Sequence, residues 1–169
     1  MDKLFNDEFV ILDGAMGTML QRAGLPVGVI PEIYTLAHPE ILESIHQAYI
    51  KAGSKITYTN TFSSSAHKLA GSGHTVDEVV SASVAVAKKA AVGKALVALD
   101  IDPIGEMLEP SGTLSFESAY DMFREILISG AKAGADLIAI ETFTDLAKLR
   151  IPNIAEKENT KLPNFAPMS

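Results

Sequence analysis

The chain has 169 residues, a length that suits one domain with a hydrophobic core of its own. A net charge of −7 and the lack of any basic cluster argue against a nucleic-acid partner. No apolar run approaches the roughly 20 residues that cross a bilayer, and the N-terminus lacks the apolar region of a signal peptide. We therefore expect a cytoplasmic protein with no membrane partner. Without cysteine, the sequence supplies neither a disulfide nor a thiolate metal ligand.

The first predicted element is the apolar run Phe9-Val10-Ile11-Leu12, which leads into Asp13. An uninterrupted apolar run of this length predicts a strand buried on both faces. The turn that follows, Gly14-Ala15-Met16-Gly17, frees backbone N–H groups that no large side chain shields. Small molecules bind at the carboxyl ends of strands in α/β folds, so this pattern favours a binding site over a purely structural turn.

Further strands are expected to begin near residues 55, 95 and 136, with helices between them. Apolar spacing and end signals predict helices over residues 16–23, 40–52 with Pro39 before and Gly53 after, 75–92 with Thr75 as N-cap, and 116–133 with Ser115 as N-cap and Gly134 after. Such alternation of strand and helix predicts an α/β fold with a parallel sheet and right-handed crossovers.

The remaining segments are expected to be less regular. Residues 24–31, 63–73 and 103–112 are predicted as loops, the second with the option of a short helix. A fourth long helix is expected to begin near Asp145, and Pro152 should interrupt it at a cost of about 3 kcal/mol. Residues 162–167 contain two prolines, which restrict a fifth strand there to an edge or irregular role.

The sequence also contains an internal repeat. The block Lys51-Ala52-Gly53-Ser54-Lys55-Ile56 resembles Lys132-Ala133-Gly134-Ala135-Asp136-Leu137, and Asn60-Thr61-Phe62 and Glu141-Thr142-Phe143 follow at the same offset. Two βα units separate the copies, so in a (β/α) barrel Asn60 and Glu141 should lie at the same height on alternate strands. Chance similarity between two junctions of helix, glycine and strand is the alternative.

Each predicted strand ends in a polar side chain: Asp13, Asn60, either Asp100 or Asp102, and Glu141. Taken singly, most of these fit a helix N-cap or a turn, but parallel strands bring their carboxyl ends to one edge. Together they predict a pocket there. The carboxylates of Asp13 and Glu141 could hold an ammonium group, and the turn amides could receive a carboxylate, which suits an α-amino acid.

At these positions the sequence resembles the homocysteine S-methyltransferase family, in particular the homocysteine-binding module of cobalamin-dependent methionine synthase. The resemblance covers nearly everything to about residue 150, whereas residues 151–169 diverge. The motifs that carry it are Leu12-Asp13-Gly14-Ala15-Met16-Gly17-Thr18, His38-Pro39-Glu40-Ile41, Ile45-His46, Tyr49-Ile50-Lys51-Ala52-Gly53, Thr59-Asn60-Thr61-Phe62, His67-Lys68-Leu69, Asp102-Pro103-Ile104-Gly105 and Glu141-Thr142-Phe143.

The resemblance implies a (β/α)8 TIM barrel, which takes about 250 residues. Residues 1–169 would then form its N-terminal half, with about four βα units and the start of strand five. It also implies methyl transfer to the zinc-activated thiol of homocysteine, giving methionine, with methylcobalamin, betaine or S-methylmethionine as the methyl donor. Carried over by position, Asp13 and Glu141 hold the homocysteine amino group, Gly14, Ala15 and Met16 cradle its carboxylate, and Asn60 and Thr61 form pocket wall.

The sequence departs from the family at the metal. The zinc ligands of the family are cysteines after the later strands, and this chain has none. The four histidines, His38, His46, His67 and His74, do not show metal-ligand spacing, so we expect surface or packing roles for them. The isolated chain is therefore predicted to be incomplete and inactive.

Two other functions stay open at this point. The chain could be a non-catalytic half-barrel whose unpaired strand edges lead it to associate with itself or with a complementary C-terminal half. It could instead be an unrelated small α/β protein with a doubly wound sheet, although no Gly-x-Gly-x-x-Gly pattern follows the first strand.

Overall fold

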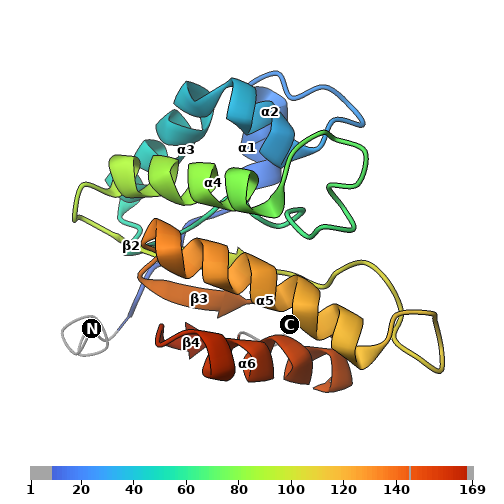
Figure 1. Ribbon diagram of the computed structural model, residues 1–169. Coiled ribbons are helices and arrows are strands. Elements are labelled where there is room, and N and C mark those ends of the chain that lie inside the picture. The colour runs from blue at the N-terminus through green and yellow to red at the C-terminus, as the bar shows by residue number, and fades with distance from the viewer. Residues whose placement is uncertain (1–8, 145, 167–169) are drawn as a thin grey trace.

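The computed structural model describes residues 9–144 and 146–166 and shows a parallel sheet with helices packed on it (Figure 1). The helices are α1 (Met16–Arg22), α2 (Pro31–Ala37), α3 (Pro39–Ala52), α4 (Val76–Ala91), α5 (Phe116–Ala133) and α6 (Leu146–Asn159). The strands are β1 (Ile56–Tyr58), β2 (Leu96–Ile101), β3 (Leu137–Ile140) and β4 (Asn164–Phe165). None of these helices combines the length and apolar character needed to span a membrane.

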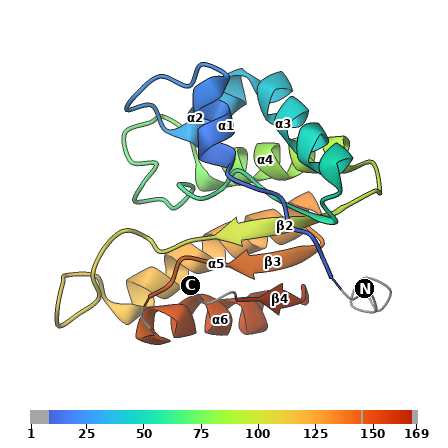
Figure 2. The ribbon, with the colours of Figure 1, turned by 180° about the vertical axis from the view of Figure 1, so that it is seen from behind.

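The four strands pair in chain order, β1-β2-β3-β4, and every pairing is parallel. Figure 2 shows the strand side of the sheet, with α5 and α6 behind it. A doubly wound sheet reverses its strand order at a switch point, and this sheet does not. The doubly wound alternative is therefore wrong, and the sheet has the order of a partial α/β barrel.

The main core fills the space between β2, β3 and the helices. Alternate residues of each strand point to this side, as the period of two requires. Leu99 and Ile101 of β2 and Ile138 and Ile140 of β3 all pack in the helix-side cluster. The residues between them point to the opposite face, where the buried cluster is Ile56, Ala98, Leu137 and Ala139.

The helix ends agree with the local signals in the sequence. The side chains of Thr75 and Ser115 accept the backbone N–H groups of Glu78 and Ser118, so both are N-caps as predicted. Gly53 and Gly134 close α3 and α5 in the left-handed region, with φ of 116° and 94°. Such a φ is open to glycine without a steric cost.

The first apolar run is not the buried strand that its composition predicts. Leu12 forms an isolated bridge to Ile56, whereas Phe9 is 80% exposed and Ile11 57% exposed. Parallel hydrogen bonds still join the run to β1, from Lys55 N–H to the carbonyl of Ile11 and from Asp13 N–H to that of Ile56. Burial on both faces needs other elements packed over each face. Val10 packs against the inner cluster, but the described residues leave the face of Phe9 and Ile11 largely uncovered.

Two further predictions about elements are wrong. The loop predicted over residues 24–31 is present except at its last residue, Pro31, where α2 begins, and this helix is absent from the predicted elements. Proline suits the first helical position because its missing N–H would have no partner. Helix α6 runs through Pro152 without interruption. One lost hydrogen bond is offset by packing, since Ile151 and Ala155 are buried in the main core. Asp145, the predicted start of this helix, lies outside the described residues, whereas β4 occupies the predicted edge position.

Candidate functional site

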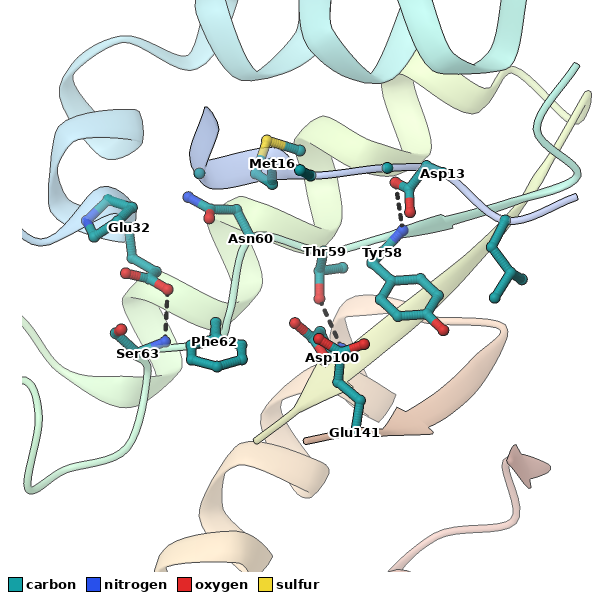
Figure 3. A pocket seen from close by; sticks show the side chains of 15 residues that line it. Asp13, Met16, Glu32, Tyr58, Thr59, Asn60, Phe62, Ser63, Asp100 and Glu141 are labelled. Atoms are coloured by element: carbon teal, nitrogen blue, oxygen red, sulfur yellow. Dashed lines mark hydrogen bonds between the residues drawn. The ribbon is translucent and has the colours of Figure 1, made fainter. Parts of the chain in front are cut away.

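A cavity of about 530 Å³ lies at the carboxyl ends of β1, β2 and β3 (Figure 3). The turn after the first apolar run forms one side of it and the start of α2 another. It is lined by Leu12, Asp13, Gly14, Ala15, Met16, Gly17, Pro31, Glu32, Tyr58, Thr59, Asn60, Phe62, Ser63, Asp100 and Glu141. Six of the seven predicted site residues are among them, and Thr61 is not.

The pleat of the strands explains why acids reach this cavity. Ala98 of β2 and Ala139 of β3 belong to the cluster on the face away from the helices. Two residues further on, with the same orientation, come Asp100 and Glu141. Both therefore extend the inner face at the end where the strands stop. Burial raises the pKa of Asp100 well above its usual range, and the neighbouring carboxylate of Glu141 adds to the shift.

Asp13 is held from β1 by two hydrogen bonds to one oxygen. Its Oδ2 accepts the Thr57 hydroxyl at 2.7 Å and the Tyr58 backbone N–H at 2.9 Å. Burial raises the pKa of Asp13, and these two hydrogen bonds oppose the rise because they favour the ionised form. Burial also raises the pKa of Glu141, with a further contribution from the negative charge of Asp13. Asp13 and Glu141, which the sequence predicts to act together, therefore both line the cavity, and the charge of Asp13 affects the pKa of Glu141.

Glu32 is a cavity residue that the sequence analysis missed. It lies at the second position of α2, is 2% exposed, and accepts the Ser63 N–H through Oε1 at 2.6 Å. Burial raises its pKa to about 7. An acid after proline at a helix start is a weak sequence signal, since it is common on exposed first turns. Its burial comes from the tertiary packing of α2 against α4 and against the loop after β1, which no local sequence pattern shows.

Asn60 and Thr61 both fix the loop after β1, but Thr61, predicted as pocket wall, is not part of the cavity lining because its hydroxyl is buried against β2. Asn60 lines the cavity, and its side-chain NH₂ donates to the Thr35 hydroxyl at 2.9 Å. The Thr61 hydroxyl donates to the backbone carbonyl of Asp100 at 2.8 Å, which ties the loop after β1 to the end of β2. Asn60 and Glu141, equivalent in the internal repeat, both line the cavity.

The second acid of β2's end has a different role. Asp102 forms an ion pair with Lys68, next to the cavity but not in its lining. Burial raises the pKa of Asp102 to about 6, and Lys68 opposes that rise. The ion pair joins the loop after β1 to the chain after β2, which favours a structural role for Asp102 over a binding role.

Each of the four histidines contacts a different partner. Three of them contact glutamates on the surface: His38 with Glu40, His67 with Glu106 and His74 with Glu78. The fourth, His46, is fully buried in α3. Across residues 9–144 and 146–166, no group of three or more histidine, aspartate or glutamate side chains is placed to hold a metal ion.

A parallel sheet in chain order, covered by helices on one face and with acids and turn amides at its carboxyl edge, defines this chain as part of an α/β barrel with a small-molecule cavity. The particular family follows from sequence: the model of the family described as homocysteine S-methyltransferase matches residues 10–169. The chain belongs to the homocysteine S-methyltransferase family.

Relatives agree with this assignment. The chain is 30% identical over 162 residues to a methionine synthase of Mycobacterium tuberculosis, covering 87% of this chain and 13% of the relative. It is 29% identical over 154 residues to betaine–homocysteine S-methyltransferase 1 of Sus scrofa, covering 85% of this chain and 53% of the relative. The chain therefore spans much less than the full length of either.

Solved structures agree on the fold. The metallated form of the homocysteine methyltransferase MmuM from Escherichia coli superposes with a TM-score of 0.87 at 21% identity, covering 99% of this chain and 65% of that chain. The oxidised form gives 0.86 at 22% identity. The predicted α/β barrel fold, present in part, is thereby confirmed.

Proposed function

We propose that this chain forms the homocysteine-binding part of a homocysteine S-methyltransferase. In this proposal, Asp13 and Glu141 hold the ammonium group of L-homocysteine, and the amides of Gly14, Ala15 and Met16 hold its carboxylate. The observation that carries the proposal is that both carboxyl groups and this turn line one cavity, in a chain of this family.

The electrostatics of the cavity favour a cationic group. Asp13, Glu32, Asp100 and Glu141 all line it, and burial raises the pKa of each. A bound ammonium favours the ionised form of a nearby carboxyl group, so binding is coupled to the release of protons below the raised pKa values. The ligand thereby supplies positive charge that compensates this group of acids.

Zinc does not fit the residues present. The sequence has no cysteine, and the part of the chain that the structure describes contains no cluster of metal ligands. One of the solved structures is described as the metallated form of MmuM, whereas cobalamin is implied for methionine synthase only by the resemblance given in the sequence analysis. We infer that the isolated chain binds the amino acid but does not transfer a methyl group, and that thiol activation depends on residues outside this sequence.

Calorimetric titration tests the binding proposal with L-homocysteine and with 4-mercaptobutanoate, which lacks only the amino group. We expect the chain to prefer L-homocysteine and the variants Asp13→Asn and Glu141→Gln to lose most of that preference. Glu125→Gln, on the exposed side of α5, is the matched control and should leave it unchanged. Equal affinity of the unaltered chain for the two ligands contradicts the proposal.

The inactivity of the isolated chain has its own assay. The chain is incubated with zinc, L-homocysteine and each of methylcobalamin, betaine and S-methylmethionine, and methionine is measured. We expect none above the rate without protein. Methionine formation by the 169-residue chain alone would show that the missing cysteines are not needed.

Association is the second candidate function, and one observation favours it. Phe9 and Ile11 are exposed on a segment that pairs with β1 on one side only among the described residues. Such an edge can accept another strand, from a second copy or from a complementary C-terminal half. Light scattering tests the first option: a concentration-dependent dimer that Ile11→Lys abolishes supports it, and a monomer at all concentrations contradicts it.

A further inference from the structure

A buried histidine is linked to the candidate ammonium-binding carboxylate through one hydroxyl group. His46 of α3 and Thr57 of β1 are both 0% exposed, and His46 Nδ1 lies 2.8 Å from Thr57 Oγ1. The same Oγ1 lies 2.7 Å from Asp13 Oδ2. The line of contacts runs from the helix layer, through the sheet, to the cavity.

The chemistry of these groups assigns the direction of each hydrogen bond. Asp13 Oδ2 also accepts the Tyr58 N–H, so it acts as an acceptor toward Thr57 as well. A hydroxyl has a single proton to donate, and Thr57 gives it to Asp13. His46 must then donate to Thr57 from Nδ1, which places the imidazole proton on Nδ1 and leaves Nε2 unprotonated.

The surroundings of the imidazole agree with a neutral ring. Burial lowers the pKa of His46 to about 4, so it is uncharged at neutral pH. Within the described part of the chain, Nε2 has no hydrogen-bond partner. Burying an unpartnered nitrogen is unfavourable, and an apolar side chain would fill the same space without that cost. The donor at Nδ1 is therefore what the imidazole adds at this position.

We infer that His46 and Thr57 are positioning residues for Asp13, which orient its carboxylate so that Oδ1 accepts the amino group of the ligand. Thr57 and the Tyr58 N–H both hold Oδ2, which fixes the plane of the carboxylate. His46 in turn fixes the rotation of the Thr57 hydroxyl, because its Nδ1 proton occupies the oxygen's acceptor side. The identity of the ligand rests on the proposed function, whereas the hydrogen bonds from His46 to Thr57 and from Thr57 to Asp13 do not.

The hydroxyl of Thr57 is tested by Thr57→Val, which keeps the side-chain shape, and Thr57→Ser, which keeps the hydroxyl. We expect Thr57→Val to weaken binding of L-homocysteine about tenfold, because Asp13 loses the charge-assisted hydrogen bond that orients its carboxylate. Binding of 4-mercaptobutanoate should stay the same, and Thr57→Ser should restore the affinity for L-homocysteine. Ser129→Ala, which removes a hydroxyl that donates to Asp77 Oδ1 at 2.8 Å between α4 and α5, controls for the loss of a buried hydroxyl in general.

Two measurements need no ligand. Nitrogen-15 NMR of the unaltered chain should show His46 protonated at Nδ1 and unprotonated at Nε2. Titration followed at the carboxyl carbon should show a higher pKa for Asp13 in Thr57→Val than in the unaltered chain, because the Thr57 hydrogen bond lowers it. Thr57→Ser gives the second variant if Thr57→Val does not fold, and there the pKa of Asp13 should stay near that of the unaltered chain.

The outcomes separate the two proposals. If the unaltered chain does not prefer L-homocysteine, the proposed function fails, and the tautomer of His46 and the pKa of Asp13 still decide the positioning role. If Thr57→Val weakens both ligands equally, the hydroxyl is merely structural and the inference is overturned. A proton on Nε2 of His46, or an unchanged pKa of Asp13 in Thr57→Val, overturns it as well.

Discussion

Replacing Glu32 with glutamine removes an acid from a buried position while keeping the oxygen that Ser63 uses. The carboxyl group is 2% exposed and accepts the Ser63 N–H at 2.6 Å, and among the described residues its Oε2 has no partner. Burial raises its pKa from the ordinary 4.5 to about 7. Glutamine imitates the protonated acid at every pH, so Glu32→Gln isolates the free energy of ionising this one group.

The pKa values give both the size and the sign of the effect. Well below pH 4.5 Glu32 is protonated in both the folded and the unfolded chain, so it does not change the free energy of unfolding with pH. Between pH 4.5 and about 7 only the unfolded chain ionises, so the stability of the unaltered protein falls as pH rises. Each pH unit costs about 1.4 kcal/mol, so Glu32 lowers the free energy of unfolding by about 3 kcal/mol above pH 7.

Urea unfolding followed by circular dichroism at pH 4.5, 6 and 8 measures this effect. We expect Glu32→Gln to gain about 3 kcal/mol relative to the unaltered chain between the first and the last pH. Glu125→Gln, an exposed acid on α5, should show no comparable trend. A difference between Glu32→Gln and the unaltered chain that is flat across this range, or that falls with rising pH, would refute the reasoning that burial holds the proton on Glu32.

Two further predictions concern the packing around the sheet. Gly130→Ala should lower the free energy of unfolding by roughly 1–3 kcal/mol in urea titrations, because its Cβ would lie 2.7 Å from Leu99 Cδ1 in the core. Lys68→Met should destabilise the chain more at pH 8 than at pH 5, because Asp102 loses its partner and takes up a proton at the lower pH. In Lys68→Met, carboxyl NMR should show a pKa of Asp102 above the value of about 6 that it has beside Lys68.

Each of these has a matched control. Gly17 lies in the helix α1, and apart from the chain next to it no atom of the described residues falls within 4 Å of the Cβ that Gly17→Ala would add, so stability should not decrease. Lys88→Met removes the partner of Asp136 from a more exposed ion pair, so it should lower the free energy of unfolding by at most about 1 kcal/mol. A loss for Gly17→Ala as large as that for Gly130→Ala, or equal effects of the two lysine variants, would contradict the packing arguments.

Local chemistry made much of the fold predictable. Thr75 and Ser115 cap helices because a side-chain oxygen satisfies a backbone N–H three residues on, a relation contained in a few neighbouring positions. It was also predictable that Asp13 and Glu141 lie at the same edge of the sheet, because the carboxyl ends of parallel strands point in one direction. Their substrate-binding role, like that of the other predicted site residues, stays a prediction.

Other features depend on contacts between distant parts of the chain. The run from Phe9 to Leu12 is apolar enough for a buried strand, but burial also needs other elements packed over both faces, and the face of Phe9 and Ile11 is exposed. Pro152 breaks an isolated helix, yet the buried side chains beside it keep α6 continuous. The first run stays exposed because it lacks tertiary contacts, and α6 stays continuous because its tertiary contacts outweigh a local preference of a few kcal/mol.

The sequence by itself determined the alternation of β1, β2 and β3 with the long helices α4 and α5, the parallel pairing and the polar residues at the strand ends, because these follow from local patterns repeated along the chain. Only the tertiary structure decided that Glu32 joins Asp13, Asp100 and Glu141 in one cavity, and that His46 reaches Asp13 through Thr57. The reason is physical: burial, and with it the pKa of an acid or the partner of a hydroxyl, is set by atoms far away in the sequence.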